Sequence, residues 1–83
     1  MTKQTFYMLV VVSTRDPKAP QKERIAAMIE QERRTKAVRD YLKARGHSYK
    51  KRSHAFATRE EAEQAIVQMG FPFKIDICEA QWV

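Results

Sequence analysis

Cysteine, long apolar runs and glycine are all scarce in this sequence of 83 residues. The one cysteine, Cys78, excludes an internal disulfide framework and is typical of a reducing compartment, so we expect a cytoplasmic location. The apolar run from Phe6 to Val12 has only seven residues, whereas a membrane-spanning helix needs about 20. No small-residue cleavage site follows this run, so the sequence predicts neither a signal peptide nor a membrane segment.

Only two glycines are present, Gly46 and Gly70. The segment Ser13–Pro20 between the first apolar run and the next helical segment contains two prolines and no glycine. A loop that lets backbone amides approach a nucleotide phosphate requires glycine. The strand–loop–helix start of the chain therefore does not predict a nucleotide-binding fold.

Acidic residues are outnumbered, with 10 Asp and Glu against 16 Lys and Arg and a net charge of +6. The imbalance is local. Residues 33–52 (RRTKAVRDYLKARGHSYKKR) hold nine Lys and Arg and one acid, Asp40, for a charge of +8, so the remainder of the chain sums to −2. A concentrated excess of one sign indicates a surface for an oppositely charged partner.

The length predicts a single domain spanning residues 1–83, because so short a chain cannot enclose two cores. A domain of this size buries only about 60% of the surface that its unfolded chain exposes, so the monomer should be marginally stable. Dimerisation is one common remedy, and we expect a homodimer.

Two segments read as helices. Residues 21–45 have a helical composition, with Gly46 as the stop signal. Thr58 is placed to cap the Glu61 amide at the start of a second, shorter helix, which Gly70 ends. The apolar residues of this second helix follow the i, i+3, i+4, i+7 pattern: Ala62, Ala65, Ile66 and Met69.

The long helix carries two apolar clusters, which are Ile25, Met28 and Ile29, then Val38, Tyr41 and Leu42. At about 100° per residue these clusters point roughly 135° apart, so one straight helix cannot press both against the same sheet. Either the helix breaks near residues 33–35, or its first half faces another partner. The i,i+4 pair Glu30–Arg34 favours a continuous helix.

Three segments read as strands. Residues 5–12 do not alternate with polar residues, which predicts a central strand covered on both faces. Residues 47–57 predict a turn and then an edge strand from Tyr49 to Ala57, where charged side chains discourage aggregation. A third strand starts near Phe73. After Ile77 its apolar positions change face, which predicts a bulge or a strand covered on both faces.

The predicted fold is therefore α+β, with a small three-stranded sheet and two helices in β-α-β-α-β order, the first helix being long. Two helices can cover one face of so small a sheet. A second copy of the chain could cover the other face, or could bind the surface formed by Ile25, Met28 and Ile29.

Catalysis and metal binding find little support in the residue pattern. A lone cysteine in a strand is usually a small buried apolar residue, and His47, His54 and Cys78 lack the spacing of metal ligands. We expect no catalytic residue, no metal and no cofactor.

The basic stretch interleaves cations with rings, a mixture that suits phosphates and unstacked bases. The sequence thus predicts a small non-enzymatic protein that binds DNA or RNA without indicating which. Its expected phosphate contacts are Arg33, Arg34, Lys36, Arg39, Lys43, Arg45, Lys50, Lys51 and Arg52, with His47 and Tyr49 available for stacking. The alternative is an inhibitor or adaptor module that docks on an acidic protein through the same surface and the Ile25 cluster.

Overall fold

The computed structural model, which describes residues 3–82, has the predicted β-α-β-α-β order. Its elements are β1 (Gln4–Val11), α1 (Gln21–Ala44), β2 (Ala55–Phe56), α2 (Arg59–Met69) and β3 (Ile75–Trp82). The strand order is β2-β1-β3, with β1 antiparallel to both neighbours. The expected central position of the first strand and edge position of the second are confirmed.

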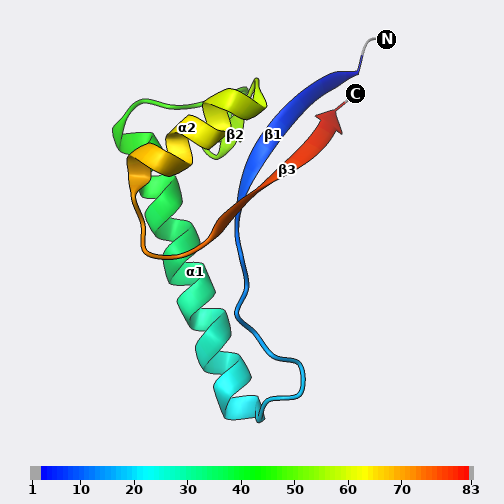
Figure 1. Ribbon diagram of the computed structural model, residues 1–83, viewed down its shortest axis with the longest axis vertical. Coiled ribbons are helices and arrows are strands. Elements are labelled where there is room, and N and C mark those ends of the chain that lie inside the picture. The colour runs from blue at the N-terminus through cyan, green and yellow to red at the C-terminus, as the bar shows by residue number, and fades with distance from the viewer. Residues whose placement is uncertain (1–2, 83) are drawn as a thin grey trace.

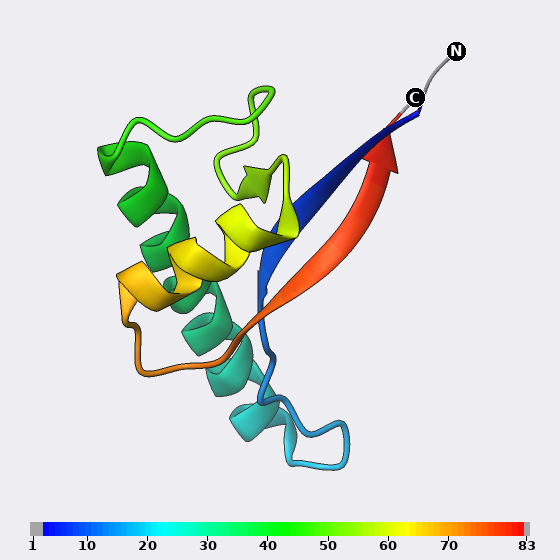
Figure 2. The ribbon, with the colours of Figure 1, turned by 45° about the horizontal axis from the view of Figure 1, so that its top comes forward.

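The two helices lie on the same side of the sheet and cross one another, as Figures 1 and 2 show from two directions. The core lies between them and β1, with Leu9 and Val11 facing Val38 and Leu42 of α1. The α2 residues Ala62, Ala65 and Met69 and the β2 residue Phe56 complete the buried set. Only the second half of α1 contributes to this core, because the first half extends beyond the sheet (Figure 1).

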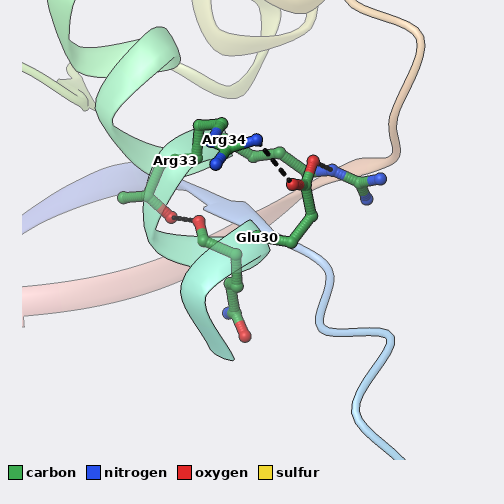
Figure 3. A network of polar contacts seen from close by, with 5 residues as sticks. Glu30, Arg33 and Arg34 are labelled. Atoms are coloured by element: carbon green, nitrogen blue, oxygen red, sulfur yellow. Dashed lines mark hydrogen bonds and ion pairs between the residues drawn. The ribbon is translucent and has the colours of Figure 1, made fainter. Parts of the chain in front are cut away.

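Helix α1 is continuous through residues 33–35. Glu30 accepts contacts from Arg33 and Arg34 at 3.4 and 3.2 Å, and the Thr35 hydroxyl donates to the Gln31 carbonyl at 2.8 Å (Figure 3). These local contacts bridge the segment that has no apolar side chain. The two apolar clusters therefore do point to different places, one into the core and one into solvent.

Both helices end as their glycines predict. In α1, the His47 amide donates to the Leu42 carbonyl at 2.9 Å and the Gly46 amide to the Lys43 carbonyl at 3.0 Å, the two bonds of a Schellman motif. Gly46 has φ +72°. Helix α2 starts with the Glu61 amide donating to the Thr58 hydroxyl at 3.2 Å, as expected.

Strand β3 pairs with β1 in one unbroken register from Ile75 opposite Val11 to Trp82 opposite Gln4. The change of apolar face after Ile77 is therefore not a bulge. Ile75 and Ile77 face the helices, whereas Trp82 lies on the opposite face and stacks on Phe6, with ring centroids 4.2 Å apart. Each end of β3 is covered on a different side.

The prediction of a strand from Tyr49 to Ala57 was wrong, because only Ala55 and Phe56 pair with β1. Residues 49–52 instead form a tight two-residue turn, in which Tyr49 and Arg52 exchange backbone hydrogen bonds of 3.2 and 3.0 Å. Lys50 and Lys51 both have positive φ, +49° and +68°. The turn lies on the face of the sheet opposite the helices, where Tyr49 and Arg52 contact the Trp82 ring.

A left-handed conformation costs a residue with a Cβ about 1–2 kcal/mol. We predict that Lys51→Gly raises the free energy of unfolding by about 0.5–1 kcal/mol, because glycine avoids this cost and loses only part of the gain to chain entropy. Urea unfolding followed by circular dichroism measures the change. The matched control is Lys36→Gly within α1, which should lower stability by about 1 kcal/mol. A loss of stability in both variants would contradict the strain at Lys51.

Candidate nucleic-acid interface

A cavity of about 360 Å³ lies where the segment after α1 folds back against the helix. Four cations and four neutral or titratable donors line it, and no carboxylate does: Arg39, Lys43, His47, Ser48, Lys51, Arg52, Ser53 and His54. The reversal at Gly46 brings residues 47–54 opposite the α1 residues Arg39 and Lys43. A site with this lining suits an anion, since guanidinium, ammonium and hydroxyl groups all donate hydrogen bonds.

A second cavity, of about 470 Å³, adjoins the first along α1. Arg39 lines both cavities, and Lys36 lines the second together with Met28 and Glu32. Lys36 and Lys43 are therefore joined through Arg39 into one stripe. We use the term basic face for the five cations that line the two cavities: Lys36, Arg39, Lys43, Lys51 and Arg52.

Three cations of the predicted site lie elsewhere, two of them on α1 and the third, Arg45, at its C-cap. Arg33 and Arg34 contact the Glu30 carboxylate. The Arg34 guanidinium also lies 5.3 Å from the centre of the Phe73 ring, and that of Arg45 lies 4.1 Å from the Tyr41 ring. Because Phe73 and Tyr41 pack against the core, Arg34 and Arg45 lie over the core-facing side of the helix, away from Arg39 and Lys43.

Little of the predicted positive charge is neutralised within the described part of the chain. There, Arg33 and Arg34 are the members of the predicted set that form ion pairs, both with Glu30. All the members of the basic face are exposed. Their charge is therefore available to a partner.

The two aromatic residues of the predicted site are both held in place. The His47 ring stacks on Phe56 at 4.3 Å, and its Nε2 lies 2.6 Å from the Ala55 carbonyl oxygen. Tyr49 accepts a hydrogen bond of 2.8 Å from Gln4, and its ring lies 6.1 Å from the Trp82 ring. His47 lines the cavity but joins α1 to β2, so its contacts are structural.

The predicted site residues do not include Ser48, Ser53 or His54, although all three line the cavity and His54 is one of the rings interleaved with the cations in the sequence. Burial lowers the pKa of His54, and the positive charges of Arg52 and Arg39 lower it further. The smaller, electrostatic part of this shift arises because both guanidinium groups lie close to the imidazole. The only sequence signal for these residues is their position within and beside the basic stretch.

The surface predicted for a partner is exposed as expected from the helix geometry. Ile25, Met28 and Ile29 expose 47%, 46% and 52% of their surface. Met28 also lines the cavity that contains Lys36 and Arg39. The apolar surface and the basic face are therefore contiguous.

Within residues 3–82, no three His, Cys, Asp or Glu side chains gather as metal ligands would. No helix in this part of the chain is long and apolar enough to cross a membrane. Comparisons with protein-family models, with curated proteins and with solved structures gave no match. The fold and the surface thus define a small α+β domain in which five cations gather on the basic face.

His54 provides a test of the charge distribution. We predict that Arg52→Ala raises the pKa of His54, because it removes the larger of the two charge effects that lower it. An NMR titration of the imidazole resonances measures this value. Arg45→Ala is the matched control, since its guanidinium contacts Tyr41 instead, and it should leave the His54 value unchanged.

The same shift fixes the sign of a stability effect. The unfolded chain takes up a proton at His54 near pH 6.5, before the folded chain does. The contribution of His54 to stability should therefore be lost as pH falls from about 6.5 through the lower pKa of the folded state. If Arg52→Ala and Arg45→Ala changed the His54 pKa equally, the effect could not be assigned to the charge of Arg52.

Proposed function

We propose that this protein is a non-enzymatic accessory protein that binds DNA or RNA through the basic face. The observation that supports this most directly is the 360 Å³ cavity, in which four cations meet without a carboxylate. Nucleic-acid backbones present regularly spaced phosphates, and proteins bind them mainly with Lys and Arg. The stripe from Lys36 through Arg39 to Lys43 follows one side of α1 and continues into the turn, which suits a linear polyanion.

The hydroxyls of Ser48 and Ser53 add neutral donors beside these cations. Ser side chains and basic residues together make up much of the phosphate contact in known complexes. A phosphate near His54 would also favour the protonated imidazole, so binding should draw a proton to this residue.

A second candidate function is docking on an acidic protein surface as an inhibitor or adaptor. The contiguity of Ile25, Met28 and Ile29 with the basic face favours this alternative, because protein interfaces combine an apolar centre with a charged rim. The two functions differ in their dependence on the apolar residues, which nucleic-acid binding does not require.

We further propose that the protein forms a homodimer and works in the cytoplasm. The turn at residues 49–52 already covers Phe6 on the second face of the sheet, so the Ile25 surface is the better dimer contact. The exposed thiol of Cys78 suits a reducing environment.

Binding through the basic face predicts a strong salt dependence. If the five cations and Lys50 neutralise about six phosphates, log affinity for duplex DNA should fall with log salt at a slope near −5. The triple variant Arg39→Ala, Lys43→Ala and Lys51→Ala should bind at least tenfold more weakly, with a slope smaller in magnitude by about 3. Fluorescence anisotropy of labelled DNA and RNA at several salt concentrations measures both quantities.

The matched control is Arg33→Ala, Arg34→Ala and Arg45→Ala, which removes the same charge from α1 and its C-cap outside the basic face. It should retain most of the affinity and the slope. If both triple variants lose affinity equally, only net charge matters and the basic face is not the site. Retained binding of an acidic protein, with no binding of nucleic acid, would favour the alternative function.

The dimer proposal predicts a particle of twice the 9.7 kDa chain mass in light scattering at micromolar concentration. Ile25→Ser with Ile29→Ser should reduce the mass to that of one chain, because it removes the apolar contact. Val67→Ser is the control, since Val67 is 80% exposed on α2, away from this surface. A monomeric wild-type protein would overturn the proposal.

A further inference from the structure

A cluster of rings and cations lies on the face of the sheet opposite the helices. It combines both ends of the chain with the turn after α1, and we call it the Trp82 cluster: Gln4, Phe6, Tyr49, Lys50, Arg52 and Trp82. Neither the two cavities nor the Ile25 surface described above includes the rings of this cluster. The predicted site residues do not include Trp82.

The Trp82 ring rests on a rigid support. Phe6, which is only 3% exposed, stacks on it with ring centroids 4.2 Å apart and planes inclined by 27°. Tyr49 lies nearly parallel to it, at 6.1 Å and 20°, and Gln4 fixes the tyrosine through its hydroxyl. Trp82 and Tyr49 are both only half-buried, so each keeps ring surface open to solvent.

Two cations from the strained turn lie over the same rings. The Lys50 ammonium is 5.8 Å from the Trp82 ring centre, and the Arg52 guanidinium is 5.1 Å from it. Among residues 3–82 neither cation has a carboxylate partner within 4 Å. An exposed contact between a cation and a ring is weak, so a phosphate competes readily for both side chains.

Arg52 belongs to the Trp82 cluster and also lines the 360 Å³ cavity of the basic face. A nucleic-acid strand whose phosphates occupy that cavity would therefore carry a neighbouring nucleotide to the Trp82 cluster. The contacts of this turn hold Lys50 and Lys51 at positive φ, and strain of this kind concentrates at ligand-binding sites.

We propose that the Trp82 cluster makes the protein selective for single-stranded nucleic acid, with one unpaired base stacking on Trp82 while Lys50 and Arg52 hold adjacent phosphates. This inference rests on the proposed function. Stacking on aromatic side chains is the usual way in which proteins bind single strands, and it tolerates any base. Bases within a duplex are already paired and stacked, so they cannot occupy this position.

The chain contains one tryptophan, so its fluorescence reports directly on this site. Titration with a short oligothymidine should quench the emission, with the same midpoint as the anisotropy change of a labelled oligomer. A blunt duplex of equal length should bind without comparable quenching. Trp82→Leu should weaken single-strand binding by about 5- to 150-fold in anisotropy, the equivalent of one lost stack, and leave duplex binding unchanged. Trp82→Phe should restore most of the affinity.

The outcomes separate this inference from the proposed function. Single-strand binding with unchanged emission, or equal quenching by the duplex, would overturn the stacking role and leave the basic face as the binding site. Absence of binding to both forms at low salt would overturn the proposed function itself. The quenching measurement uses the wild-type chain, so it stands even if Trp82→Leu unfolds.

Discussion

The end of α1 is tied to β2 through His47, and the position of the whole basic segment depends on this connection. The His47 amide donates to the Leu42 carbonyl, the His47 ring stacks on Phe56, and its Nε2 contacts the Ala55 carbonyl. Leu42 and Phe56 belong to the same core, so the connection is anchored at both ends. Residues 48–54, which lie between His47 and Ala55, therefore form a short loop with α1 on one side and the sheet on the other.

This loop contains backbone strain, which is located at Lys50 and Lys51. Reversing direction within two residues requires positive φ at both, a conformation that glycine and asparagine adopt more easily. Lysine in these positions sacrifices stability for charge at the tip of the turn. The cations of this loop therefore lie between the basic face and the Trp82 cluster. Arg52 both lines the 360 Å³ cavity and lies over the Trp82 ring.

Features encoded by neighbouring residues could be predicted from the sequence. Thr58 and Gly70 mark the ends of α2, the pair Glu30–Arg34 bridges the centre of α1, and the unbroken apolar run of β1 indicates a central strand. Features that depend on distant partners could not. Residues 49–52 have the composition of an edge strand, but in the structure they form a turn whose Arg52 side chain contacts the Phe6 and Trp82 rings.

The candidate site shows both sides of this limit. Helix periodicity alone predicts that Lys36, Arg39 and Lys43 share one stripe, but it does not predict that Lys51 and Arg52 come to lie beside that stripe. Lys36, Arg39 and Lys43 share one side of α1, whereas Arg34 and Arg45 lie over Phe73 and Tyr41. The role proposed for Trp82 was likewise invisible, because its neighbours in space come from the opposite end of the chain and from the turn.

The way in which the cations are held bears on what the surface can do. Several of them, including Arg45, Lys50 and Arg52, lie over aromatic rings and have no carboxylate partner among residues 3–82. At an exposed position a ring and a carboxylate stabilise a cation by similar amounts, about 0.5–1 kcal/mol and 0.2–1 kcal/mol respectively. Only the carboxylate cancels the charge, however. A ring fixes the direction of the side chain and leaves its field intact.

An unneutralised field has a cost, since like charges such as Arg39 and Lys43 on one side of a helix repel each other. Burial is the main cause of the lowered pKa of His54, and the charges of Arg52 and Arg39 lower this pKa further, so a positive imidazole is disfavoured beside them. A bound anion would remove the repulsion, so the same arrangement that weakens the free protein would strengthen its complex with a polyanion. This linkage gives a physical reason for a chain of 83 residues to keep the five cations of the basic face together.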